Sequence, residues 1–209
     1  IADVLGVDLA QREDFKHWVD ALLSAGNRAA YDQDRLDGIA EASKDIRAYF
    51  EKVFDQRSAN PGEDLISGFI QAEVDGQKLT RSEVLNMAIL LLIGGVETTT
   101  NLLGISFTHM KRIGNIQEKL RADPELIGPF VEEMLRYDGP VQMLFRHTTR
   151  AVEMHGVTIP ANTLVMPLLG AANHDDRKYD NAEQFELDRK PKEMMSFGQG
   201  PHFCLGFYL

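Results

Sequence analysis

Apolar residues recur at helical spacing through most of the first two-thirds of the chain. One amphipathic stripe covers residues 15–23, and a second covers residues 36–57. Such spacing places the apolar side chains on one face of a helix. A Pro-Gly break at residues 60–62 ends the second stripe, and a shorter apolar stretch follows at residues 65–72. The pattern therefore predicts amphipathic helices joined by short turns.

The longest helix is predicted between Thr80 and Lys111, because no proline interrupts this stretch. Thr80 and Glu83 have the spacing of a capping box at its start. A helix of this length spans roughly 45 Å at 1.5 Å per residue, enough to cross a whole domain. Gly94 and Gly95 lower helix propensity near its middle, so a kink or local opening is expected there.

The pattern changes after a helix that is predicted to start at Asp123-Pro124 and to end before Gly139-Pro140. Strand-like stretches with Gly and Pro turns follow, and then an irregular, polar stretch. The expected fold class is mainly α with small β-sheets. Its parts are a helix-rich part at residues 1–138, a β-rich segment at 145–170, and a meander with a cysteine loop at 171–206.

Composition and charge narrow the function classes. The chain is 44% hydrophobic and 26% charged, which is typical of a soluble globular protein. Its net charge of −10, without a basic stripe, argues against nucleic-acid binding. The apolar run at residues 85–96 lies between Glu83 and Glu97 and is too short for a bilayer. This run favours a buried core helix, and no membrane segment is expected in this part of the protein.

The single cysteine, Cys204, lies in the glycine-rich segment Phe197–Gly206. Gly198, Gly200 and Gly206 are expected to take left-handed backbone angles and to allow close approach of a flat group. A lone cysteine is most often a small buried hydrophobe. In this loop, however, a thiolate suits a soft transition-metal centre, as in thiolate-ligated haem iron. The ten-residue context favours the metal ligand.

Other polar groups stand out on the predicted helices. Glu133 and Arg136 are three residues apart and share a helix face, an abundant and weak pattern by itself. Near Gly94, Glu97 and Thr98 place an acid and a hydroxyl inside an apolar helix. They could relay protons beside a reactive centre, or they could belong to a kink solvated by water, and the motif alone favours neither.

The joint presence and order of these motifs resemble the cytochrome P450 family of haem-thiolate monooxygenases. The matching motifs are Gly-Gly-Val-Glu-Thr at residues 94–98, Glu-x-x-Arg at 133–136 and Phe-x-x-Gly-x-His-x-Cys-x-Gly at 197–206. Residues 172–175 and 185–189 resemble the segments before the haem loop in bacterial members. The resemblance implies the carboxy-terminal part of a catalytic domain, a P450 fold incomplete at both ends, with Leu209 inside a helix.

The resemblance also implies how haem is held. Cys204 would be the axial ligand of the iron, with the amides of Leu205 and Gly206 donating to the sulfur. Phe197 would exclude water from the thiolate, and His202 and Arg146 would bind the haem propionates. The full set of implied cofactor-binding residues is Cys204, His202, Arg146, Phe197, Gly198, Leu205, Gly206 and Gly94.

The remaining roles follow from the same resemblance. Thr98 would organise water where dioxygen is activated, and Glu97 would be the adjacent acid. Glu133, Arg136 and Arg189 would form a buried structural cluster beneath the cysteine loop. The implied substrate-binding residues are Leu90, Ile93, Gln142 and Leu144.

The implied function is a haem-thiolate monooxygenase that inserts one oxygen atom from O2 into a hydrophobic small organic substrate. The cofactor would be haem b, and electrons would come from a separate ferredoxin- or flavodoxin-type partner. The expected location is cytoplasmic. Two alternatives stay open: a haem- or substrate-binding fragment without turnover, and a peroxide-dependent haem-thiolate enzyme.

Overall fold

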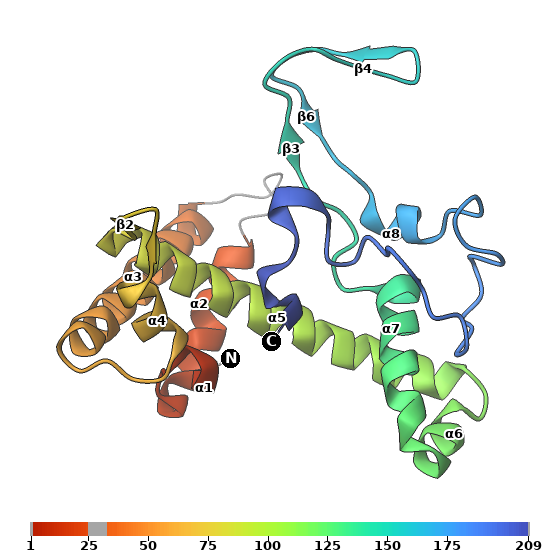
Figure 1. Ribbon diagram of the computed structural model, residues 1–209, viewed down its shortest axis with the longest axis horizontal. Coiled ribbons are helices and arrows are strands. Elements are labelled where there is room, and N and C mark those ends of the chain that lie inside the picture. Colours follow the sequence, from red (N-terminus) through yellow and green to blue (C-terminus); the bar gives the residue numbers. More distant parts are fainter. Residues whose placement is uncertain (1, 25–32, 209) are drawn as a thin grey trace. The chain divides into compact units, whose positions relative to one another are not determined.

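The computed structural model describes residues 2–24 and 33–208. The chain divides into two compact units, unit 1 at Ile1–Glu97 and unit 2 at Thr98–Leu209. The long helix α5, Arg81–Arg112, contributes residues to both units (Figure 1). Leu209, where the sequence predicts a continuing helix, lies outside the described residues.

The described residues of unit 1 are mainly helical, as the sequence predicts, and include one short hairpin. Helices α2, α3 and α4 confirm the amphipathic stripes, and a turn at Asp75-Gly76 with positive φ angles joins the two strands. Before α5, its elements are α1 (Ala2–Leu5), the 3-10 helix η1 (Leu9–Gln11), α2 (Arg12–Ser24), α3 (Gln33–Ala59), α4 (Leu65–Gln71), β1 (Glu73–Val74) and β2 (Gln77–Lys78).

The start of α5 follows the predicted capping box. The Thr80 amide donates to Glu83 Oε2 at 2.7 Å, and the Glu83 amide donates to Thr80 Oγ1 at 3.3 Å. Every residue from Arg81 to Arg112 is helical, so the expected opening at Gly94-Gly95 does not interrupt the helix. Intrahelical hydrogen bonds and packing on unit 1 outweigh the low helix propensity of the glycines.

Helix α5 is buried on one face only. Val84, Leu85 and Leu92 lie in the unit 1 core, whereas Leu90 is 59% exposed. Among residues 2–24 and 33–208, α5 alone is long and apolar enough to cross a membrane by length and composition, and 17% of its apolar window is buried. The expected buried core helix is therefore found on the face that carries Leu85 and Leu92, and not on the face that carries Leu90.

Asp64 joins α4 to the rest of unit 1. It caps α4 by accepting from the Ser67 amide at 2.8 Å, and the Arg57 Nε donates to it at 2.5 Å. The same Arg57 donates through Nη2 to the carbonyl of Gly6 at 2.7 Å. Burial raises the pKa of the Asp64 carboxyl, but the hydrogen bonds from Ser67 and the Arg57 charge outweigh burial and leave this pKa below its ordinary value.

A lowered pKa in the folded state predicts acid-sensitive stability for unit 1. The ionised Asp64 stabilises the fold at pH values above its ordinary pKa, and this stabilisation is lost as pH falls through the lower folded-state pKa. Asp64→Asn should lower the free energy of unfolding by about 1 kcal/mol at neutral pH and weaken the acid dependence below about pH 4. Urea unfolding across pH measures both effects. The neighbouring Glu63→Gln is the control, and equal acid dependence in the two variants would contradict the assignment.

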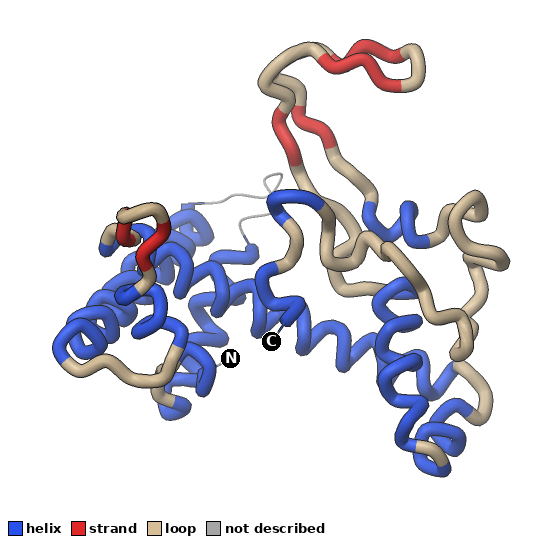
Figure 2. The backbone as a smooth tube through the Cα atoms, in the orientation of Figure 1, coloured by secondary structure: helices blue, strands red, loops and turns tan. Residues whose placement is uncertain are grey.

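Unit 2 combines helices with small antiparallel sheets and a long irregular segment, which appears as tan loop after α8 in Figure 2. In two antiparallel pairs, β3 pairs with β6 and β4 with β5. After α5, its elements are α6 (Ile116–Ala122), η3 (Pro124–Leu126), α7 (Ile127–Asp138), β3 (Arg146–His147), β4 (Val152–Met154), β5 (Val157–Ile159), β6 (Leu164–Val165), α8 (Leu169–Asn173), η4 (Gly200–His202) and η5 (Leu205–Tyr208).

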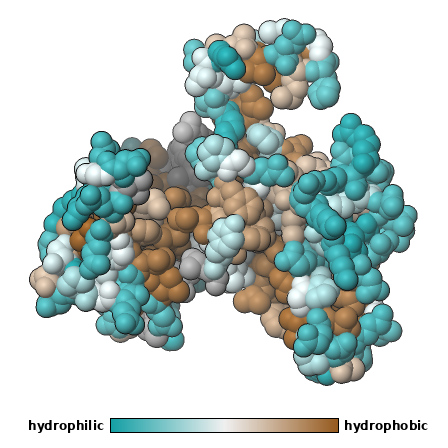
Figure 3. All heavy atoms as spheres, viewed as in Figure 1, coloured by the Kyte–Doolittle hydropathy of each residue, from teal (hydrophilic) through white to brown (hydrophobic). Residues whose placement is uncertain are grey.

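The core of unit 2 lies between α6, α7 and the second half of α5. Ile116, Phe130 and Met134 are buried there, and Leu102 and Ile105 of α5 pack against them. Apolar residues, brown in Figure 3, also reach the surface, and Phe107 is 67% exposed. This core holds α7, whose buried face carries the charged residues of the candidate site.

Candidate haem-binding site

A buried ion pair lies on the inner face of α7. The side chains of Glu133 and Arg136 are each 0% exposed, and two parallel contacts join them, Nη2 to Oε1 at 2.7 Å and Nε to Oε2 at 2.9 Å. The other guanidinium hydrogens go to the carbonyls of Asn173, Ala182 and Gln184 at 2.8–2.9 Å. Arg136 thus uses all of its donors, and it ties the irregular segment of unit 2 to α7.

Arg189 completes this cluster, as the resemblance implies. Its Nε donates to Glu133 Oε1 at 2.9 Å, and its side chain is 7% exposed. The amide of Glu186 donates to the same Oε1 at 3.0 Å, and the Glu186 carboxylate lies 3.3 Å from Arg189 Nη2. The structure therefore brings Glu133, Arg136 and Arg189 together, with Glu186 as a fourth member that sequence reasoning missed.

The cysteine loop is a compact turn of backbone. The Cys204 amide donates to the carbonyl of Phe197 at 2.9 Å and closes the loop. Gly198 and Gly200 have φ angles of 68° and 73°, which favour glycine, as expected. The expected left-handed angle at Gly206 is wrong, because Gly206 lies inside the 3-10 helix η5.

Aromatic rings surround the cysteine loop. The rings of Phe197, Phe203 and Phe207 form one group, with centroids 5.0–6.4 Å apart. Cys204 is a free, half-buried thiol, and a Cβ added to Gly206 would lie 3.8 Å from its sulfur. The residue at 206 therefore adjoins the sulfur, in the place where the resemblance puts a donor amide.

The donor set fits a metal that brings its own equatorial ligands. Cys204 supplies one thiolate, and the described residues contain no cluster of His, Cys, Asp or Glu side chains that could hold an ion. A porphyrin supplies the in-plane nitrogens of haem iron, so the protein needs to offer only an axial ligand. The lone thiol in a positive-φ glycine loop therefore fits haem.

The expected oxygen-side residues lie along the middle of α5. Gly94 is exposed, and a Cβ added there would meet nothing within 4 Å. Leu90 lies one turn earlier and is exposed, whereas Glu97 and Thr98 are half-buried. Ile93, an expected substrate contact, is half-buried and packs against the hydrophobic core of unit 1.

The segment after α7 carries the other expected contacts. The Gln142 side chain donates to the carbonyl of Gly139 at 2.6 Å, and its oxygen lies 2.0 Å from the position of a Cβ added to Gly170. Its amide is thus used to fold its own segment. The Leu144 amide donates to the Pro167 carbonyl at 3.1 Å. The Leu144 side chain is half-buried.

The two residues expected at the propionates are both exposed. Arg146 lies in β3, where its Nη1 donates to the carbonyl of Phe145 at 2.8 Å. His202 ends the 3-10 helix η4, two residues before Cys204. Both side chains belong to unit 2.

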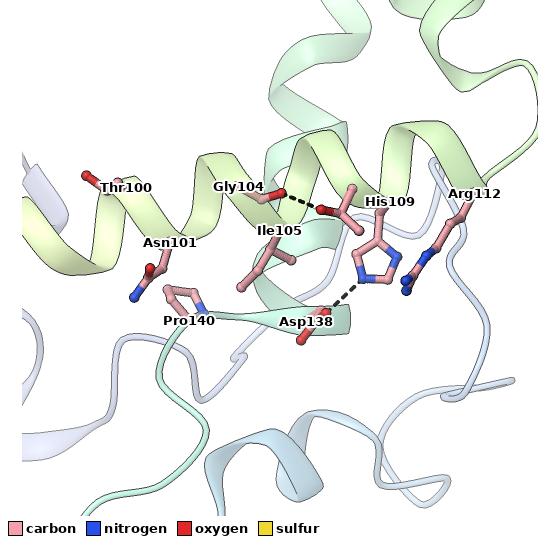
Figure 4. A pocket seen from close by; sticks show the side chains of 9 residues that line it. Thr100, Asn101, Gly104, Ile105, His109, Arg112, Asp138 and Pro140 are labelled. Atoms are coloured by element: carbon pink, nitrogen blue, oxygen red, sulfur yellow. Dashed lines mark hydrogen bonds and ion pairs between the residues drawn. The ribbon is translucent and has the colours of Figure 1, made fainter. Parts of the chain in front are cut away.

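A cavity of 570 Å³ in unit 2 was not expected from the sequence. It lies between α5 and the end of α7, and His109 Nε2 contacts Asp138 Oδ2 across it at 2.8 Å (Figure 4). The ring of Tyr137 lies edge-on to His109, with centroids 5.4 Å apart. No sequence signal links His109 and Asp138, because they are 29 residues apart and belong to different helices.

Comparisons with known proteins agree on one family. The family model described as Cytochrome P450 matches residues 29–209. Putative cytochrome P450 133B1 of Xylella fastidiosa is 35% identical over 209 residues, covering 100% of this chain and 52% of that protein.

Solved structures give the same result. CYP109E1 from Bacillus megaterium in complex with testosterone is 35% identical with a TM-score of 0.88, covering 99% of this chain and 55% of that chain. P450BioI in complex with a hexadec-9Z-enoic acid ligated acyl carrier protein is 36% identical with a TM-score of 0.89, covering 100% of this chain and 54% of that chain.

The chain spans about half the length of the curated relatives it matches. Its helices, small antiparallel sheets and irregular cysteine segment confirm the expected fold class. The motifs, the fold and the family match lead to one conclusion: this chain belongs to the cytochrome P450 family.

Proposed function

We propose that the protein that contains this chain is a haem-thiolate monooxygenase. The observation that carries the proposal is a lone thiol in a loop built on a buried Glu133–Arg136–Arg189 cluster, in a chain of the cytochrome P450 family. Haem b, when bound, supplies an iron centre that activates O2, so that one oxygen atom enters the substrate and the other is reduced to water.

The residues of the cysteine loop would hold and tune this cofactor. Cys204 would supply its thiolate to the haem iron, and the amides of Leu205 and Gly206 would donate to the sulfur and moderate its donor strength. Phe197 and Gly198 shape the surface that excludes water from the thiolate. His202 and Arg146 bind the propionates, which their exposed positions and positive or polar side chains permit.

Residues of α5 would handle oxygen and protons. Gly94 leaves space for a small molecule beside the helix, as the empty volume at its Cβ position suggests. Thr98 and Glu97 are half-buried, where a hydroxyl and a carboxyl can order water and pass a proton.

The substrate would be a hydrophobic small molecule that contacts Leu90, Gln142 and Leu144. Exposed Leu90 supports this class, as do relatives solved with testosterone or with a fatty acyl chain on its carrier protein. Ile93 contributes less, because its side chain packs on the unit 1 core. A ferredoxin- or flavodoxin-type protein would supply electrons, and the protein would work in the cytoplasm.

The first test is spectral and uses the full-length protein. Reduction under carbon monoxide should give the absorption band characteristic of thiolate-ligated haem. A screen of hydrophobic compounds by binding difference spectra then identifies a substrate, and product formation with reductant and O2 tests turnover. Binding without O2-dependent product would support a binding module. Product with peroxide alone would support the peroxide-dependent alternative.

Thr98→Ala should uncouple reductant consumption from product formation, with peroxide released instead. The variant should retain haem, because Thr98 lies on α5 and not in the cysteine loop at residues 197–206. The measurement is the ratio of product to reductant consumed, together with peroxide. Thr99→Ala and Thr100→Ala are matched controls at exposed positions of the same helix. Wild-type coupling in Thr98→Ala would contradict the role of this hydroxyl.

A further inference from the structure

One buried side chain joins the glutamate–arginine cluster to the start of the cysteine loop. Asn173 is the last residue of α8 and is 3% exposed. Its backbone carbonyl accepts from Arg136 Nη1 at 2.9 Å. Its side chain faces the loop, where Oδ1 accepts from the Met195 amide at 2.7 Å and Nδ2 donates to Ser196 Oγ at 2.9 Å.

Ser196 extends this connection back to α7. Its hydroxyl accepts from Asn173 and donates to the Leu135 carbonyl at 2.6 Å. Leu135 lies in the last turn of α7, where helix carbonyls lack a partner further along the helix. Gly139 keeps the space open, because a Cβ there would lie 2.5 Å from the Leu135 oxygen and 3.5 Å from Ser196 Oγ. The Ser196 hydroxyl therefore fits closely in this space, and it is used both as an acceptor and as a donor.

The same residues begin the turn that carries the thiol. The Met195 carbonyl accepts from the Gly198 amide at 2.9 Å, and the Phe197 carbonyl accepts from the Cys204 amide at 2.9 Å. Fixing Met195 and Ser196 thus fixes one end of the closed loop. The path from Arg136 to Cys204 runs through a single asparagine and then through backbone.

We propose that Asn173 is a positioning residue for the thiolate, acting through Met195 and Ser196 on the place of Cys204. The Asn173 amide offers an acceptor and a donor in one plane, as this site uses them. The expected effect on haem ligation rests on the proposed haem-thiolate function. The hydrogen bonds of Asn173 and Ser196, in contrast, join residues of this chain alone.

The test uses the full-length holoprotein with Asn173→Asp, which keeps the size and removes the donor, and with Ser196→Ala. Ser196→Thr is the conservative rescue, and Asn60→Asp is the control at an exposed asparagine of unit 1. One readout is hydrogen exchange of the peptide that contains residues 195–204, compared with peptides from α7. The other is the fraction of the carbon monoxide complex that shows thiolate ligation.

Loss of one buried hydrogen bond should speed exchange at residues 195–204 about tenfold in Asn173→Asp and Ser196→Ala. Exchange in α7 should stay at the wild-type rate. The fraction of the carbon monoxide complex that shows thiolate ligation should fall in both variants, and Ser196→Thr should retain the wild-type fraction. Unchanged exchange and ligation, or faster exchange throughout unit 2, would overturn the proposal. If Asn173→Asp does not fold, the comparison of Ser196→Ala with Ser196→Thr decides the test. Absence of the thiolate band in the wild type would instead refute the proposed function, while exchange still tests the positioning.

Discussion

Cys204→Ser is expected to abolish the thiolate band of the reduced carbon monoxide complex and to reduce O2-dependent product to the background without protein. A serine hydroxyl stays protonated near neutral pH and is a hard donor, so it cannot replace a soft thiolate on iron. Neither the half-buried site nor the hydrogen bond from the amide of residue 204 to the Phe197 carbonyl requires sulfur. The fold should therefore survive.

The measurement compares the spectrum, the haem content and the turnover of the full-length variant with the wild type. Circular dichroism and the urea midpoint are the controls for folding. A thiolate band that persists in Cys204→Ser would show that another cysteine of the full-length protein ligates iron, and it would remove Cys204 from the site.

Glu133→Gln should lower the free energy of unfolding by about 3–5 kcal/mol, because it leaves buried guanidinium groups without their counter-charge. Both side-chain oxygens of Glu133 are used, by Arg136, by Arg189 and by the Glu186 amide. A glutamine would turn an amide donor towards a guanidinium. Since a domain is stable by only about 5–15 kcal/mol, this loss would reduce the folded, haem-loaded fraction strongly.

The measurement is denaturant unfolding of the full-length protein, with haem content determined in parallel. Glu132→Gln is the matched control, one residue earlier on the exposed face of α7, and should change stability by no more than about 0.5 kcal/mol. If the two variants were equally stable, the cluster would not hold the irregular segment in place.

Local pattern was sufficient for most of the helices. The stripes at residues 15–23 and 36–57 correspond to α2 and α3, and the capping box begins α5 as predicted. Of the kink or local opening predicted at Gly94-Gly95, the structure shows no break in the helix, because propensity is a weak preference that helix continuity and packing override, and the kink stays a prediction. Gly206 shows the same limit, since a glycine in a sequence does not reveal whether its φ is positive.

The candidate site divides in the same way. The spacing of Glu133 and Arg136 and the context of Cys204 are visible in the sequence, because their chemistry depends on residues that are close along the chain. Their joint order then resembles one family, which the comparisons support. The sequence did not show that the Gln142 amide donates to the Gly139 carbonyl or that the Ile93 side chain packs on the unit 1 core, and the substrate roles of both residues stay predictions.

The sequence by itself determined the helical stripes, the lone thiol in its glycine loop and the family to which the chain belongs. Only the tertiary structure decided which backbone carbonyls Arg136 satisfies, that His109 meets Asp138, and that Asn173 links α8 to Ser196. These partners are 23–48 residues apart. A hydrogen bond depends on positions matched to a few tenths of an ångström, and packing between distant elements, not local periodicity, sets those positions.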